Sequence, residues 1–462
     1  MKNPYIIPVL SLCIAFSADA KKVLDHSSFD DWKKVTNHSL SNDGKWTAFS
    51  VNPQEGDGIL TLRNTTNGKA IEIPRGAGIA FTADSRWAVA NIKPLFKDTR
   101  QARIDKKKNF DMPQDSLAIV DLKNATVTRI PQVKGFSIGK KGGEWVAYSS
   151  CDTTVTKDMK LSDKEAGLPL VVRNLASGEW KVYPYVGEYS FSEDGRRLAM
   201  VAKPQSGDSV FHTGVTVRYL PEGKDFLIDE GKKHYGAPVF SMDGLKLAYT
   251  ATNDSNDTGT RRMQLWMSSL SSEPTAPKEF RMDITTGRKG PNLQPPHASD
   301  PELQEKLMKE WHEKMSANAP FGLYINQYSK PIFSHNGRRL YVGVAPEVAP
   351  DDTTLVSFER PELDIWRWDA PYTPPQEKHR LDELKEMTFP VVIDLENGDY
   401  RLIEYNPLAT VVASYSLDPD WVLLRDSSKE IVSQQWNYYA PEEISVVNVI
   451  DGQRREIGTV YE

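Results

Sequence analysis

One serine lies in a spacing that serine hydrolases use for their nucleophile. Gly135-Phe-Ser137-Ile-Gly139 matches the G-x-S-x-G pattern, which functions when the serine sits on a strained turn between a strand and a helix. The segment continues instead into Lys140-Lys-Gly-Gly-Glu-Trp-Val-Ala-Tyr148, which has the pattern of a hairpin turn followed by a strand. We therefore expect Ser137 not to be a nucleophile, and we assign no catalytic residue to this chain.

The other residue types that commonly carry chemistry are scattered. No histidine falls in H-E-x-x-H or pairs with a cysteine, and no glycine-rich phosphate loop is present, so the sequence predicts no metal and no cofactor. Adjacent Glu442 and Glu443 begin an expected strand and are interpreted as a solvated edge. Cys151 is expected to be a buried, inert thiol, because no histidine is close to it in the sequence. The histidines are His26, His38, His212, His234, His297, His312, His335 and His379.

An unusually aromatic segment is the candidate functional site. It reads Asp364-Ile-Trp366-Arg-Trp368-Asp-Ala-Pro-Tyr372. In one interpretation, Trp366, Trp368 and Tyr372 pack this segment onto its own blade. In the other, they form a docking surface for another domain or the rim of a substrate site, since exposed aromatic side chains serve well as anchors.

The elements that must position these residues follow from a repeated turn. A short polar turn, often Ser-x-Asp-Gly, precedes a run such as Leu-Ala-Tyr, and Asp-Gly or Asn-Gly supplies the positive φ that tight hairpins need. The seven copies are Ser41-Asn-Asp-Gly44, Thr82-Ala-Asp-Ser85, Lys141-Gly-Gly143, Ser192-Glu-Asp-Gly195, Ser241-Met-Asp-Gly244, Ser334-His-Asn-Gly337 and the degenerate Leu417-Asp-Pro-Asp420.

A second repeat interleaves with the first. After each turn hairpin comes a strand–turn–strand segment, such as Leu60 to Gly68 and Val391 to Gly398, with the apolar and polar alternation of half-buried strands. Two hairpins make a four-stranded blade, and one blade cannot bury both of its faces alone. The sequence therefore predicts an all-β, seven-bladed β-propeller of four-stranded antiparallel blades. We expect its ring to close between the strands Trp46 to Val51 and Trp421 to Arg425.

Two partly helical insertions interrupt this rhythm near the sixth blade. The first covers about 282–328, where Ser299 and Glu302 have the spacing of a capping box. The second covers about 346–387 and contains the aromatic segment and a charged helical run from Gln376 to Met387. Insertions in repeat proteins often cluster on the working face.

Composition and the N-terminus limit the class of protein. The net charge of −6 is mild, and Lys106 to Lys108 is the densest basic patch, so nucleic-acid binding is not expected. Residues 1–20 have the features of a signal peptide: Lys2, an apolar stretch from Tyr5 to Phe16, and Ala18-Asp-Ala20 as a cleavage site. We expect an exported protein with its propeller over 21–462, no membrane span after cleavage and, because Cys151 has no partner, a location in a bacterial periplasm.

A family resemblance follows from these motifs. The blade motif occurs in TolB-like propellers, and the combination with Asp30-Asp-Trp32, Leu40 to Phe49 and Leu363 to Tyr372 resembles the N-terminal propeller of exported serine peptidases. These are the prolyl oligopeptidase and dipeptidyl-peptidase IV family, as found in Bacteroides-like bacteria. The resemblance implies a propeller that filters peptide substrates above a catalytic α/β-hydrolase domain. No such domain is present in these residues, so no triad can be assigned.

Three functions from different classes remain open. In the first, the chain is the substrate-gating propeller region of an exported serine peptidase acting on peptides, with its catalytic domain missing here. Alternatively, it is a stand-alone periplasmic propeller that serves as a TolB-like binding or assembly scaffold. The third possibility is a propeller enzyme in its own right, such as a lyase or glycosidase, which requires convergent His, Asp or Glu side chains at the inner ends of the strands.

Overall fold

A computed structural model describes residues 26, 28, 32–108, 111–152, 167–203, 213–231, 233–254, 260–285, 301, 303–306, 322–348, 356, 363–368, 370–437 and 439–461. The described chain is mostly antiparallel β-structure, as expected, and four of the seven sheets within the described residues have four strands. The expected signal peptide at 1–20 lies outside the described residues. Among the helices that the structure describes, none has both the length and the apolar character needed to span a membrane.

The N-terminal half begins with two separate four-stranded sheets. The first contains β1 (Lys33–Leu40), β2 (Trp46–Pro53), β3 (Ile59–Asn64) and β4 (Ala70–Pro74). The second contains β5 (Gly76–Phe81), β6 (Trp87–Ile92), β7 (Ser116–Asp121) and β8 (Thr126–Ile130). Helix α1 (Phe96–Ile104) follows β6 and was not expected from the sequence.

A seven-stranded sheet follows. Its strands are β9 (Val133–Ile138), β10 (Trp145–Ser150), β11 (Leu168–Asn174), β12 (Trp180–Phe191), β13 (Arg197–Ala202), β14 (Gly214–Tyr219) and β15 (Lys224–Glu230). It consists of two four-stranded units that share β12. Val186, near the middle of β12, pairs with Leu168 of β11 on one side and with Ala202 of β13 on the other.

The C-terminal half contains the remaining sheets. A five-stranded sheet has β16 (His234–Tyr235), β17 (Val239–Phe240), β18 (Lys246–Thr252), β19 (Gln264–Ser269) and β20 (Lys278–Phe280), and a small ladder joins β21 (Ile284–Thr285) to β22 (Gly322–Leu323). A four-stranded sheet has β23 (Ile332–Phe333), β24 (Arg339–Val344), β25 (Phe389–Asp394) and β26 (Tyr400–Leu402). The last sheet has β27 (Ala409–Val412), β28 (Trp421–Asp426), β29 (Glu442–Asn448) and β30 (Arg454–Val460), with the short helix η4 (Ser433–Gln435) between β28 and β29.

The repeated turn has a common hydrogen-bonding pattern. Ser41 Oγ accepts the Trp46 N–H at 2.9 Å and donates to Asp43 Oδ1 at 2.7 Å, and the same carboxylate accepts the Lys45 N–H at 3.0 Å. Gly44 closes the turn with a φ of +70°, which explains why glycine recurs at this position. A serine or threonine followed two residues later by Asp or Asn therefore satisfies the turn's backbone donors from within.

Successive turns also contact each other across neighbouring sheets. The Asp43 N–H donates to Ser85 Oγ at 3.1 Å, which joins the turns before β2 and β6. The Asn336 N–H donates to Asp418 Oδ1 at 2.9 Å, which joins the turns before β24 and β28. The turn repeat therefore orders each sheet against the next one as well as forming a hairpin.

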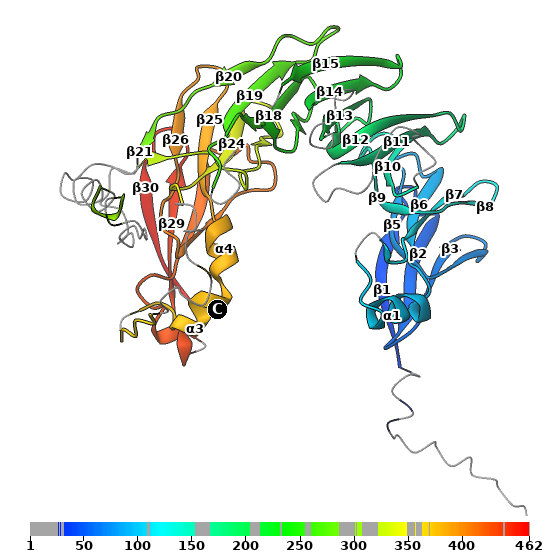
Figure 1. Ribbon diagram of the computed structural model, residues 1–462, viewed down its shortest axis with the longest axis horizontal. Coiled ribbons are helices and arrows are strands. Elements are labelled where there is room, and N and C mark those ends of the chain that lie inside the picture. Colours follow the sequence, from blue (N-terminus) through cyan, green and yellow to red (C-terminus); the bar gives the residue numbers. More distant parts are fainter. Residues whose placement is uncertain are drawn as a thin grey trace, which may run out of the picture.

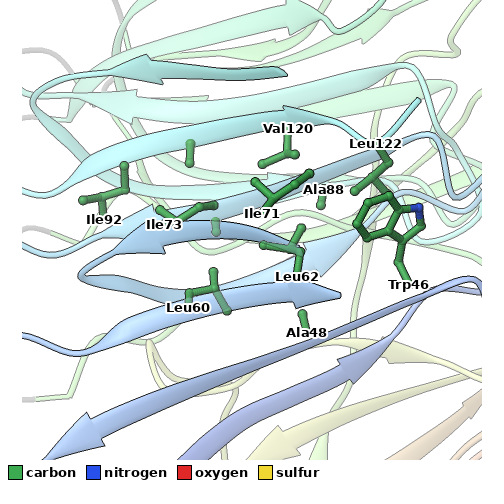
Figure 2. Close-up of a cluster of buried hydrophobic side chains, with 12 residues drawn as sticks. Trp46, Ala48, Leu60, Leu62, Ile71, Ile73, Ala88, Ile92, Val120 and Leu122 are labelled. Atoms are coloured by element: carbon green, nitrogen blue, oxygen red, sulfur yellow. The ribbon is translucent and has the colours of Figure 1, made fainter. Parts of the chain in front are cut away.

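The core lies between the faces of neighbouring sheets. Figure 2 shows Leu60 and Ile73 of the first sheet together with Ile92 and Val120 of the second, and all four are buried. Burial of apolar surface stabilises such contacts by about 25 cal/mol per Å². Similar buried clusters lie between the other pairs of neighbouring sheets, so each sheet packs against the sheet before it and the sheet after it.

The sheets follow an open arc instead of the closed ring that the sequence led us to expect. Figure 1 shows β1 and β3 at one end of the arc and β29 and β30 at the other. The face of the first sheet turned away from the second carries Val35 and Leu40, which are 62% and 61% exposed. On the last sheet, Val412 and Ile457 are also exposed. The expected contact between the β2 and β28 strands is not formed, since neither terminal sheet covers the other.

The second insertion forms two short helices where one charged helical run was expected. They are α3 (Pro374–His379) and α4 (Leu381–Glu386). Thr373 and Gln376 form a capping box at the start of α3, and Arg380, with non-helical φ and ψ of −95° and 4°, separates the helices. Most of the first insertion, including Ser299, Glu302 and Trp311, lies outside the described residues.

Candidate functional site

The three aromatic residues of the candidate site have different environments. Trp366 and Trp368 lie in a segment without regular structure and are 66% and 92% exposed. Tyr372, just before α3, is half-buried. The two tryptophans therefore make little contact with any sheet, which does not match the interpretation that they pack the insertion onto its blade. Their role as a docking surface or substrate rim remains a prediction.

Polar contacts connect this segment to the rest of the chain. Lys378 Nζ of α3 lies 3.3 Å from Asp364 Oδ1, an exposed ion pair of the kind that contributes little to stability. Gln435 Nε2, in η4, donates to the carbonyl oxygen of Pro371 at 3.1 Å. This hydrogen bond places the insertion beside the loop between β28 and β29.

That neighbouring loop carries exposed aromatic residues of its own. Trp436 is 74% exposed and Tyr439 is 65% exposed. Together with Trp366 and Trp368 we call them the aromatic rim. Trp436 and Tyr439 were not predicted as site residues, although Trp436-Asn-Tyr-Tyr439 is itself an aromatic cluster in the sequence.

Tyr372 belongs to a local stack. The guanidinium of Arg380 lies 4.2 Å from the centre of the Tyr372 ring, and the same group donates to both carboxylate oxygens of Glu383, at 3.0 and 2.9 Å. These hydrogen bonds hold the pKa of Glu383 below its usual value. The stack fixes the start of α4 and orients the Tyr372 ring.

Behind this stack lies a cavity of about 570 Å³ between the last two sheets, which Tyr372, Arg380 and Glu383 help to line. Its deepest charged group is Glu404, which is 7% exposed. Glu404 accepts the Tyr405 N–H at 2.8 Å and an Arg454 Nη1 hydrogen bond at 3.0 Å. The Glu404 carboxylate therefore has hydrogen-bond donors from the protein itself. The described residues around this cavity include no histidine or cysteine that could act as a base or nucleophile.

The other candidates from the sequence lie apart from this region. Ser137 lies within strand β9, one residue before its end, and pairs with Ala147, so the strand-to-helix turn of a nucleophile elbow is not formed. Cys151 is half-buried, and burial raises the pKa of its thiol, which opposes thiolate formation. Glu442 pairs with Arg425 at 2.6 Å, and Glu443 pairs with Lys429, at the start of β29 as expected. Within the described ranges no cluster of His, Cys, Asp and Glu is arranged to hold a metal ion.

The chain matches no family model and no curated protein. Solved structures give remote matches. A prolyl endopeptidase structure has a TM-score of 0.40 and 11% identity over 93% of this chain and 50% of that one, and the tricorn protease has 0.38 and 11% over 93% and 35%. The β-propeller domain of the Trilobed protease from Pyrococcus furiosus has 0.34 and 8% over 92% of this chain and 97% of that one. This chain thus spans half of the first protein and about a third of the second, and we draw no conclusion about activity from these matches.

Proposed function

We propose that this chain is the substrate-gating β-propeller region of an exported serine peptidase that acts on peptides. The observation that carries the proposal is the exposure of the aromatic rim, and of its residues Trp366 and Trp368 above all. Large aromatic side chains that a folded domain leaves in water are typical of a surface that another protein covers. The partner would be the α/β-hydrolase domain implied by the family resemblance.

We further propose that the open arc closes in the longer protein into a ring of seven blades, in which the two terminal sheets meet. Val35 and Leu40 on the first sheet, and Val412 and Ile457 on the last, are apolar residues that a ring closure would cover. Two spin labels measure the separation of these sheets in a Cys151→Ser background. One is attached at Lys69, in the turn after β3, and the other at Asp451, in the turn after β29. A short distance supports closure, and a long distance that persists after the hydrolase domain is added contradicts it.

The functional test uses the longer protein that includes the downstream hydrolase domain. We expect it to cleave short peptides and to spare folded proteins. Replacing Trp366 and Trp368 with alanine should lower the peptidase rate or weaken the pairing of the domains, because buried aromatic anchors typically contribute about 2 kcal/mol or more at interfaces. Trp180→Ala is the matched control, since Trp180 is also exposed but lies at the start of β12.

Two results would oppose this function. If the double tryptophan variant keeps the peptidase rate and has a lowered melting temperature, Trp366 and Trp368 pack the insertion onto its blade and do not dock another domain. A gene that encodes no hydrolase domain after codon 462 would favour the periplasmic scaffold instead. Periplasmic fractionation of the expressed protein, with and without residues 1–20, tests the proposed export.

A further inference from the structure

A second cavity lies on a different part of the chain, where β9, β12, β17 and β23 come together. Its volume is about 430 Å³, within the range of about 300–1,000 Å³ that is typical of small-ligand sites. Ser190 Oγ of β12 donates to the carbonyl oxygen of Pro238 at 2.7 Å and joins two of these strands at the cavity wall. The cavity is therefore built by several sheets.

The walls of this cavity are apolar and aromatic. Phe191 of β12 and Phe240 of β17 contribute rings, and Ile332 of β23 contributes an aliphatic surface that is 52% exposed. Tyr415 lines the outer side, with its ring edge-on to His335 at 5.0 Å between centroids, and is 85% exposed. Such walls would gain most by covering a bulky apolar group.

Charged side chains lie at the mouth of the cavity. Lys140 Nζ lies 3.4 Å from Glu193 Oε2, and Lys141 Nζ lies 4.0 Å from the other oxygen of the same carboxylate. Lys140 and Glu193 both line the cavity. Lys141 lies next to the lining residues and is not one of them. The two ammonium groups and the single carboxylate together carry one net positive charge, which favours an anionic group next to the apolar walls.

We propose that this cavity binds the C-terminal residue of a peptide when that residue is bulky and apolar. The side chain would occupy the space between Phe191, Phe240 and Tyr415, and the terminal carboxylate would pair with Lys140. A residue inside a longer chain offers the side chain without the carboxylate, so the site distinguishes chain ends from internal segments. The inference goes beyond the proposed function, because it concerns a binding site on this chain alone and requires no catalytic domain.

Calorimetric titration of the chain tests the proposal with three probes: N-acetyl-Ala-Ala-Phe as the free acid, the same peptide as its amide, and N-acetyl-Ala-Ala-Ser as the free acid. We expect the phenylalanine acid to bind about tenfold or more tightly than its amide, the effect of losing one charge-assisted contact. The serine peptide should bind more weakly than the phenylalanine acid, since it cannot cover the walls. Equal affinity of acid and amide, or no binding of the phenylalanine acid, would overturn the proposal.

Variants assign the two halves of the site. Lys140→Gln should remove the difference between acid and amide, whereas Lys123→Gln, at an exposed lysine in the turn after β7, should leave it unchanged. Tyr415→Ala should weaken both phenylalanine peptides equally, and Tyr439→Ala, at an exposed tyrosine of the aromatic rim, should not. Because Lys140 and Tyr415 are exposed, these variants should keep the melting temperature of the parent. If Lys140→Gln leaves the difference between acid and amide intact, the assignment of the carboxylate site is wrong, whatever the peptidase activity of the longer protein.

Discussion

A Cβ atom added to Gly142 would lie 2.8 Å from the Cα atom of Gly195. The turn before β10 and the turn before β13 therefore meet backbone to backbone, and only glycine leaves room for the contact. This explains the glycine at position 142 in the third copy of the repeated turn, whereas a Cβ atom at Gly143 would meet the Asp84 side chain at 2.6 Å.

The contact predicts a large effect of a single methyl group. Gly142→Ala should lower the free energy of unfolding by about 1–3 kcal/mol, because neither backbone can move away without disturbing its turn. Urea unfolding followed by tryptophan fluorescence measures it. Gly135→Ala is the control, since its Cβ would meet nothing within 4 Å. Equal stability of the two variants would show that the turns can separate without cost.

The repeated serine should contribute to stability as well as to turn shape. Ser192 is fully buried, and its Oγ accepts the Arg197 N–H at 2.9 Å and donates to Asp194 Oδ1 at 2.6 Å. Ser192→Ala leaves a buried N–H without this acceptor and should cost about 1–3 kcal/mol in thermal or urea unfolding. Ser177→Ala removes an exposed serine that accepts the Glu179 N–H and should cost much less.

Asp225 predicts a loss of stability in acid. Burial alone would raise the pKa of this carboxyl, but Lys181, Tyr183 and Arg218 donate hydrogen bonds to it and hold the pKa below the ordinary value of 3.8. A carboxylate whose pKa is lower in the folded state stabilises the fold above the unfolded pKa, and this contribution is lost as the pH falls through the folded value. Asp225→Asn should therefore be less stable than the parent at neutral pH, and the difference should shrink well below pH 3.8.

Urea unfolding at both pH values provides the measurement for Asp225. Asp399→Asn, at an exposed aspartate in the turn before β26, serves as the reference. A stability difference for Asp225→Asn that stays constant from neutral to strongly acidic pH would show that the ionised form is not favoured by folding.

We expect the ion pair of Glu404 and Arg454 to contribute to the free energy of unfolding at the junction of the last two sheets. Glu404→Ala should destabilise the fold by about 2 kcal/mol, since it leaves the Arg454 guanidinium, which is 39% exposed as a side chain, without its carboxylate. Arg454→Ala should cost at least as much, because it leaves the Glu404 carboxylate, which is 6% exposed as a side chain, without its guanidinium, and the double variant should cost less than the sum of the two. Strict additivity in this cycle would mean that the ion pair contributes nothing.

The strands and turns were predictable from the sequence because each is determined locally. Ser41 and Gly44 meet the needs of a hairpin within a few residues, and runs such as Leu60 to Leu62 alternate as a half-buried strand must. Helix α1 was missed because Leu95, at its N-cap, makes no side-chain capping bond and only Ala102 is buried, so neither a cap nor an apolar stripe marks it.

The candidate site was predictable only in part. The aromatic composition near Trp366 and Trp368 indicated the second insertion as a candidate site. The exposure of these side chains depends on which other segments of the fold cover them, and composition does not encode this. The position of the second insertion beside the Trp436 loop depends on the hydrogen bond of Gln435 to Pro371, which joins segments 64 residues apart. The shape of the arc is equally non-local, since it depends on whether the first and last sheets, far apart in the sequence, contact each other.

The shared strand β12 has a mechanical consequence. Its two halves hydrogen-bond to β11 and to β13, so the two units cannot rotate against each other without breaking a continuous backbone ladder. The other sheets along the arc share no strand, and they meet through side chains, turn contacts and a few backbone hydrogen bonds, such as that of the Val133 N–H to the Asp115 carbonyl oxygen. Relative rotation of neighbouring units is therefore most restricted at the centre of the arc, where it would break a whole ladder instead of a few hydrogen bonds.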